Sequence, residues 1–143
     1  MKKTGYFLLT ISAILFIAAC STGPKKILPK PDGGWYAEKI TMRSYVGNTL
    51  DSTWVISHKS TYNFVKDLTG TRVDSAGSSH SFTWFVNDNN DNFQLCYNTS
   101  GSQDCKLYLI VNSDKNAQKF TYTEAGSVNG SWTEEDLEMT RVD

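Results

Sequence analysis

The feature that most constrains this fold is a succession of short strand-forming segments, separated by polar turns, that runs through residues 34–143. The segments recur about every 8–12 residues, and the turns between them are rich in Gly, Asn, Asp and Ser. The sequence shows no apolar period typical of a long helix. This pattern predicts an all-β fold, either a barrel or a sandwich. We favour an antiparallel barrel because closure removes the exposed strand edges that promote aggregation.

Alternation within the segments indicates which side chains face the core. Phe82, Trp84 and Val86 fall on one face of the segment at 80–86. Residues 107–111 are apolar on both faces, so the pattern does not assign their inward side. The predicted strands cover residues 35–45, 53–57, 61–66, 71–73, 80–86, 93–96, 105–112, 119–124 and 137–142.

Two cysteines bracket one of the predicted hairpins. Cys96 and Cys105 lie on either side of a turn-rich insert, residues 97–104, and strand-like segments flank the pair. A disulfide requires Cα atoms within about 7 Å of each other and an oxidising compartment. Metal binding by this pair is the weaker alternative, because it has neither CxxC spacing nor a nearby histidine pair. The sequence therefore predicts a Cys96–Cys105 disulfide, which also sets Gln94 opposite Leu107.

The first residues have the organisation of an export signal. Two lysines precede an uncharged apolar run at residues 6–19, which is shorter than the roughly 20 residues that a transmembrane helix needs. The run ends in the sequence IAAC, which resembles the bacterial lipobox. We predict that residues 1–19 are removed and that Cys20 is acylated, which gives the chain a firm membrane anchor. The alternative is an ordinary signal peptide with a chance cysteine.

Residues 20–33 are predicted to form an extended tether, because they contain all three prolines of the chain. At about 3.1 Å per residue, the tether would hold the domain up to about 40 Å from the bilayer. Ser21 is not the aspartate linked to inner-membrane retention in enteric bacteria. No acidic cluster of the kind that marks surface export follows Cys20. We therefore predict the periplasmic face of the outer membrane, with surface exposure left open.

Charge excludes some partners. Without the two signal lysines, the chain carries 12 basic and 15 acidic side chains. Recognition of nucleic acid requires a basic face, so we do not expect a nucleic-acid partner. Acidic residues gather at positions 134, 135, 136 and 138, and we interpret this patch as a solvated turn.

Several short motifs carry a resemblance to a known family. They are GW at 34–35, TYNF at 61–64 running into LTGT at 68–71, FTW at 82–84 and LEMTR at 137–141. In this order, they resemble the small lipocalin-like domains of Bacteroidetes lipoproteins, and the resemblance covers most of residues 33–143. It implies an up-and-down barrel of about eight strands with a modest internal cavity. Leu68-Thr69 departs from the usual Asp-Gly, and the bridged hairpin at 96–105 is not a general family feature.

Motifs for catalysis or metal binding lack support. Residues 88–92 are similar to the start of a calcium loop, but Phe93 stands where glycine is needed and no glutamate occupies the twelfth position. We therefore predict a hairpin turn there. His58 and His80 are the only histidines of the chain, and neither has a motif partner. We expect no enzymatic activity, no metal site and no cofactor.

The aromatic residues provide the binding hypothesis. We predict that the barrel binds a small hydrophobic ligand, lined by Trp54, Tyr62, Phe64, Phe82, Trp84 and Tyr122. The alternative is that these side chains fill the core, as in other small barrels. The protein would then bind another protein, as an accessory of an envelope assembly or as an enzyme inhibitor. An internal cavity favours the first hypothesis, and a filled core with an exposed apolar patch favours the second.

Overall fold

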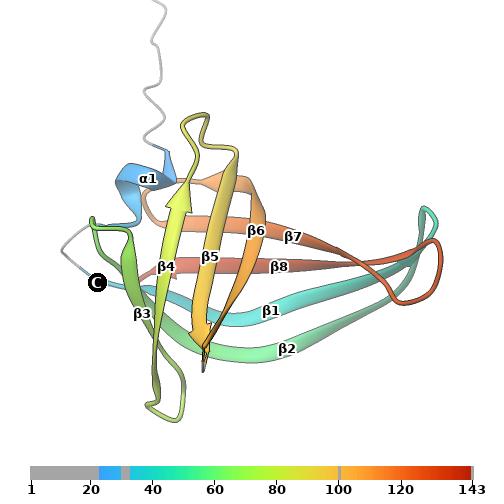
Figure 1. The fold of residues 1–143 in the computed structure, drawn as a ribbon, viewed down its shortest axis with the longest axis horizontal. Coiled ribbons are helices and arrows are strands. Elements are labelled where there is room, and N and C mark those ends of the chain that lie inside the picture. Colours follow the sequence, from blue (N-terminus) through green and yellow to red (C-terminus); the bar gives the residue numbers. More distant parts are fainter. Residues whose placement is uncertain (1–22, 30–32, 100, 143) are drawn as a thin grey trace, which may run out of the picture.

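The computed structural model describes residues 23–29, 33–99 and 101–142, which form one short helix and eight strands (Figure 1). The elements are α1 (Pro24–Ile27), β1 (Trp35–Val46), β2 (Thr49–Phe64), β3 (Thr69–Val73), β4 (Ser79–Val86), β5 (Asn92–Thr99), β6 (Ser102–Ser113), β7 (Ala117–Ala125) and β8 (Ser131–Arg141). Within these described ranges, no helix is long and apolar enough to cross a lipid bilayer.

The strands close into one antiparallel barrel. Each strand pairs with its neighbour in sequence, and β1 also pairs with β8. This order is that of an up-and-down barrel and is consistent with a lipocalin-like fold. The predicted fold class is therefore confirmed.

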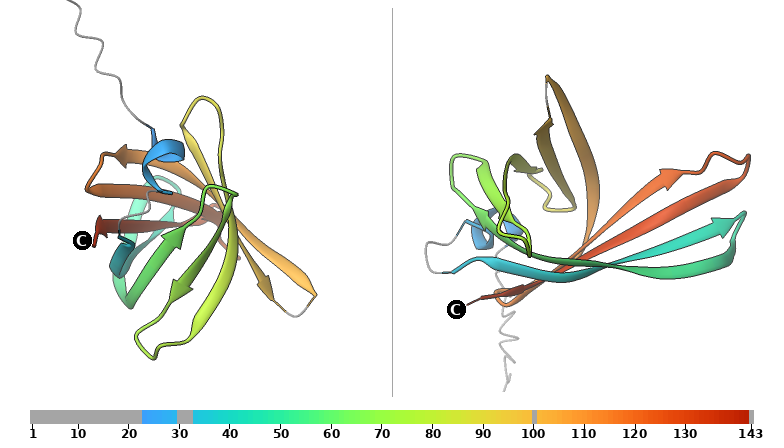
Figure 2. Two further views of the ribbon diagram at one scale, coloured as in Figure 1. Left: turned by 90° about the vertical axis from the view of Figure 1, so that its left-hand side faces the viewer. Right: turned by 90° about the horizontal axis from the view of Figure 1, so that it is seen from below.

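Two hairpins extend well beyond the closed part of the barrel. We call this projection the arm, and it comprises residues 42–56 of β1 and β2 and residues 122–134 of β7 and β8. Strand β2 pairs with β1 as far as Thr49, but with β3 only at residues 61–64. Strand β7 pairs with β8 as far as Ala125, but with β6 only as far as Thr121. The two hairpins accordingly project away from β3–β6 in Figure 1 and in the right panel of Figure 2.

One end of the barrel holds the hydrophobic core. Trp35, Phe82, Phe93 and Phe120 are almost completely buried there. Phe93 and Phe120 stack with their ring centroids 4.4 Å apart. This aromatic packing closes the end of the barrel at which β1 begins and β8 ends, and it leaves the opposite end open.

Helix α1 covers the closed end (Figure 1). Ile27 and Leu28 are buried in the core cluster, and the Leu28 carbonyl accepts a 3.2 Å hydrogen bond from Nε1 of Trp35. The prediction of an extended, unpacked tether is thus wrong for residues 24–28. Proline suits the first turn of a helix, and Ile27 and the C-cap residue Leu28 then pack on the barrel. The lipobox and the other tether residues before position 23 lie outside the described residues.

The burial of alternate side chains shows which face of β4 and of β6 points into the barrel. The prediction for β4 is confirmed, because Phe82, Trp84 and Val86 are all buried. In β6, Tyr108 points into the barrel, whereas Leu107 and Leu109 are exposed on its outer surface.

The predicted disulfide joins β5 to β6. Cys96 and Cys105 are directly paired in the register, with their Cα atoms 4.0 Å apart. The same register sets Gln94 opposite Leu107. Both predictions are confirmed, and the bridge fixes the hairpin whose inner side forms one wall of the cavity described below.

The separate strands predicted at 53–57 and 61–66 are wrong, because one strand, β2, runs through both. The polar residues His58, Lys59 and Ser60 give the sequence the appearance of a break. The register between β1 and β2 shifts here, and Lys59 has a positive φ of 36°. A β-bulge absorbs the extra residue and bends the strand without ending it. This bend lies where the arm leaves the barrel.

The acidic residues near position 135 do not form a solvated turn, so that interpretation is also wrong. They lie within β8, and Asp136 is only 2% exposed. Asp136 accepts hydrogen bonds from Arg43 at 2.8 Å and from Thr121 at 2.6 Å, and Lys119 Nζ lies 2.9 Å away. Burial alone would raise the pKa of Asp136, but the hydrogen bonds from Thr121, Lys119 and Arg43 hold it below its ordinary value.

Candidate functional site

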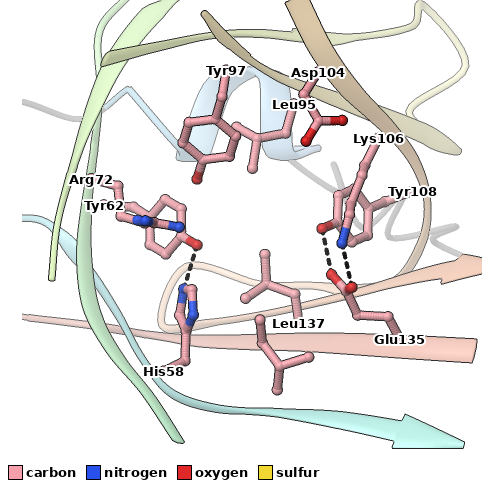
Figure 3. A pocket seen from close by; sticks show the side chains of 11 residues that line it. His58, Tyr62, Arg72, Leu95, Tyr97, Asp104, Lys106, Tyr108, Glu135 and Leu137 are labelled. Carbon is pink, nitrogen blue, oxygen red and sulfur yellow. Dashed lines mark hydrogen bonds and ion pairs between the residues drawn. The ribbon is translucent and has the colours of Figure 1, made fainter. Parts of the chain in front are cut away.

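The open end of the barrel contains a cavity of about 210 Å³ (Figure 3). Its walls come from β1, β2, β3, β5, β6 and β8. The lining residues are Ile40, His58, Tyr62, Arg72, Leu95, Tyr97, Asp104, Lys106, Tyr108, Glu135 and Leu137. Ile40, Leu95 and Leu137 contribute apolar side chains to the lining, and the other residues contribute charged, imidazole or hydroxyl groups, so the cavity suits a ligand with both apolar and polar parts.

One wall is an internally paired cluster. Glu135 is 5% exposed and accepts hydrogen bonds from Lys106 and, at 2.7 Å, from the Tyr108 hydroxyl. Burial, with the neighbouring Glu135 charge as a second cause, raises the pKa of Tyr108, so its hydroxyl remains protonated. The ammonium of Lys106 also lies 5.3 Å from the centroid of the Tyr122 ring. The Lys106 charge is therefore already balanced by a carboxylate.

The opposite wall carries a histidine–tyrosine pair. Nε2 of His58 and the hydroxyl of Tyr62 are 2.6 Å apart and share a hydrogen bond. Burial, and secondarily the positive charge of Arg72, lowers the pKa of His58, so the imidazole is uncharged at neutral pH. Burial raises the pKa of Tyr62, which keeps its hydroxyl protonated. This wall is therefore polar, but it carries no negative charge.

Arg72 and Tyr97 complete the polar wall. Arg72 lies directly opposite Tyr62 in the register, so both side chains point into the barrel. Its guanidinium carbon is 5.2 Å from the centroid of the Tyr97 ring. Within the described part of the chain, neither Nε of Arg72 nor the buried Tyr97 hydroxyl has a hydrogen-bond partner. Four buried side-chain atoms lack a partner among the described residues, and these two belong to residues that line the cavity, whereas Ser113 Oγ and Gln118 Oε1 do not.

The inner face of the arm adjoins the cavity. In the strand register Glu135 is paired with Met42, Met42 with Trp54, and Glu135 also with Tyr122. Directly paired residues point to the same face of a sheet, and Glu135 faces the cavity. Tyr122, Glu135, Met42 and Trp54 therefore form one row across the inner face of β7, β8, β1 and β2. The row ends at Trp54, which is 43% exposed.

The six aromatic residues proposed as ligand contacts separate into three groups. Tyr62 lines the cavity. Phe64, Phe82 and Trp84 are buried in the core cluster, and Nε1 of Trp84 donates to the carbonyl of Thr69. Trp54 and Tyr122 lie on the arm beside the cavity rather than in its lining. The structure thus brings Tyr62, Trp54 and Tyr122 to one face and places the other three in the core.

Sequence reasoning did not identify the polar residues of the cavity. His58, Arg72, Lys106 and Glu135 each carry a group that faces the interior. A signal was present for Lys106, since it lies two residues before Tyr108 and therefore on the same face of its strand. Arg72 had no comparable signal, because β3 is short and surrounded by polar residues.

Comparisons with protein-family models, with curated protein sequences and with solved structures found no match to this chain. The fold and the site therefore define its class. It is a closed up-and-down β-barrel, consistent with a lipocalin-like fold, and a mixed polar and apolar cavity opens at one end.

Proposed function

We propose that this chain is a non-enzymatic binding protein of the bacterial cell envelope, and that it takes a small amphipathic ligand into the open end of its barrel. The observation that carries the proposal is the cavity of about 210 Å³, in which Arg72 Nε and the Tyr97 hydroxyl have no hydrogen-bond partner among the described residues. A filled barrel that served only as a scaffold would gain nothing from polar groups left unpaired in its interior.

The cavity volume limits the ligand. An engineered cavity of about 150 Å³ holds a benzene molecule, whereas most small-molecule sites measure about 300–1,000 Å³. A cavity of about 210 Å³ therefore encloses one end of a ligand. The remainder would lie on the inner face of the arm, against Met42 and Trp54. This proposal replaces a purely hydrophobic ligand with one that carries a polar end.

The test uses the lipoprotein in lipid nanodiscs and the neutral apolar dye N-phenyl-1-naphthylamine. Equilibrium dialysis against empty nanodiscs corrects for dye dissolved in lipid. We expect saturable binding to the wild-type protein and at least a tenfold loss in Ile40→Trp, which fills the cavity. Val55→Trp adds the same side chain at an exposed position on β2 and serves as the control. Equal binding by all three proteins would refute the proposal.

The proposal includes lipid anchoring at Cys20 and membership of the lipocalin-like lipoproteins of Bacteroidetes. Its support is the sequence IAAC after a basic and apolar segment, together with the barrel order. Cys20→Ala should move the protein out of the membrane fraction of its host. If the variant remains in the membrane fraction as fully as the wild type, the anchor is not at Cys20.

A second candidate function is protein binding, and one observation favours it. Leu107, Leu109 and Val111 are 56–58% exposed and form an apolar strip on the outer face of β6. An exposed apolar strip of this kind is typical of an interaction surface. Leu109→Gln should then abolish co-purification of an envelope partner and leave dye binding unchanged. Loss of dye binding, with the partner retained, would contradict this second function.

A further inference from the structure

We infer that the cavity recognises the carboxylate of an amphipathic monocarboxylic acid, and that Arg72 is the residue that binds it. This inference rests on the proposed function and specifies the class of ligand. Two cationic side chains face the cavity, and only one of them has an acidic partner. Lys106 is paired with Glu135. Among the described ion pairs, none involves Arg72.

The surroundings of Arg72 favour an anion. Its half-buried guanidinium contacts the face of the Tyr97 ring, and its Nε has no hydrogen-bond acceptor within the described chain. A cation withdrawn from water loses hydration, and a bound anion with matching geometry offsets that loss. The planar guanidinium presents paired N–H donors that match the two oxygens of a carboxylate.

A second donor stands next to the guanidinium. The Tyr97 hydroxyl is buried without a partner in the described residues, and its ring is the one that Arg72 covers. Burial raises the pKa of Tyr97 and outweighs the opposing influence of the adjacent Tyr62 hydroxyl and Arg72 guanidinium, so the hydroxyl keeps its proton and can donate it to an anion. Figure 3 shows Tyr97 and Arg72 on the same side of the cavity, facing its centre, with Lys106 and Glu135 across from them.

The charge balance selects a monoanion. Arg72 and Lys106 supply two positive charges, and Glu135 and Asp104 supply two negative charges around the same cavity. Asp104 is exposed, so solvent screens much of its repulsion. A monoanion at Arg72 is neutralised by that guanidinium. A phosphate dianion would retain a charge close to two carboxylates, which is unfavourable at short range.

The apolar part of the ligand has a path from this point. Ile40, Leu95 and Leu137 form the apolar part of the cavity lining. Ile56 is directly paired with Ile40, and Trp54 lies two residues further out on the same strand face. An alkyl chain or an aromatic body that leaves the cavity would therefore meet the inner face of the arm.

The test compares decanoate with decanol, which has the same chain length and no charge, in the nanodisc dialysis described above. We expect the wild-type protein to bind decanoate at least tenfold more tightly than decanol, because only the carboxylate can form charge-assisted hydrogen bonds with the Arg72 guanidinium. Arg72→Gln should reduce decanoate affinity at least tenfold and leave decanol affinity unchanged. Arg72→Lys keeps the charge and should restore part of the loss. Lys115→Gln removes an exposed cation from the β6–β7 turn and should change neither affinity.

The outcomes separate this inference from the proposed function. If the dye binds but decanoate and decanol bind equally, or if Arg72→Gln does not change decanoate affinity, the carboxylate assignment is wrong and the binding function stands. If Lys115→Gln weakens decanoate as much as Arg72→Gln, overall charge and not the cavity governs affinity, and the assignment again fails. If neither the dye nor decanoate binds, both proposals fail.

Discussion

The buried carboxylate of Asp136 provides the sharpest test of how this barrel is stabilised. It accepts hydrogen bonds from Arg43 and Thr121 and forms an ion pair with Lys119, at distances of 2.6–2.9 Å. Asp136→Asn removes the charge and keeps the shape of the side chain. Hydrogen bonds to charged groups contribute about 1.5–3 kcal/mol each. Arg43 retains Glu134 and Lys119 retains Glu138, so only part of that energy is lost.

We therefore expect Asp136→Asn to lower the free energy of unfolding by about 2 kcal/mol, in the range found for disruption of buried polar networks. For a domain of this size, this corresponds to a melting temperature lower by about 8 °C. Chemical denaturation followed by circular dichroism measures the difference. Glu138→Gln is the control, because the Glu138 side chain is 53% exposed and lies 3.2 Å from the same lysine. The control should change stability by less than about 0.5 kcal/mol.

The pH dependence of the same pair of proteins gives an independent check. The pKa of Asp136 in the folded protein lies below its ordinary value. Its contribution to stability is therefore complete above the ordinary pKa of about 3.9 and is lost as the pH falls through the lower, folded value. The difference between wild type and Asp136→Asn should shrink as the pH falls from about 6 to below 3. A variant equal to wild type at pH 7, or a difference independent of pH, would refute this account of Asp136.

Two further predictions concern the turn between β2 and β3 and the beginning of β3. Leu68 has a positive φ of 69° and an exposed side chain. Leu68→Gly should therefore relieve left-handed strain and raise the free energy of unfolding by up to about 1 kcal/mol in the same denaturation assay. A loss of stability would show that the leucine side chain contributes more than the strain costs. A Cβ added at Gly70 would lie 2.4 Å from the Phe82 ring and 2.6 Å from the backbone carbonyl oxygen of Asn63, so Gly70→Ala should lower stability by about 1–3 kcal/mol. An unchanged melting temperature would show that both the ring and the backbone adjust without cost.

The barrel was predictable because the sequence signals that specify it lie within single strands and the turns next to them. Alternation places Phe82, Trp84 and Val86 on one face, and turn residues mark most of the strand ends, although the polar residues 58–60 gave a false break within β2. The cysteine pair then fixes one register, because Cys96 opposite Cys105 determines every other pair in that hairpin. Strand order followed, because short turns between successive strands favour antiparallel neighbours.

The site was not predictable to the same degree, because its residues are separated in sequence and meet only through closure of the barrel. Arg72 contacts Tyr97 across the intervening strand β4. Lys106 forms an ion pair with Glu135, which lies 29 residues further along the chain. A run of acidic residues in β8 resembles a turn when it is considered alone. Successive acidic side chains of β8 point to opposite faces of the strand. Asp136 pairs with Arg43 and Lys119 on one face, and Glu135 pairs with Lys106 on the other.

The most direct test of ligand binding is native mass spectrometry of the protein, purified from its own host in mild detergent. We predict the mass of the acylated chain with one disulfide, plus a small molecule that denaturation releases and that is absent from Ile40→Trp. A released monocarboxylic acid would also support the role of Arg72. A wild-type protein that carries no small molecule, or the same released molecule from Ile40→Trp, would contradict binding in the cavity.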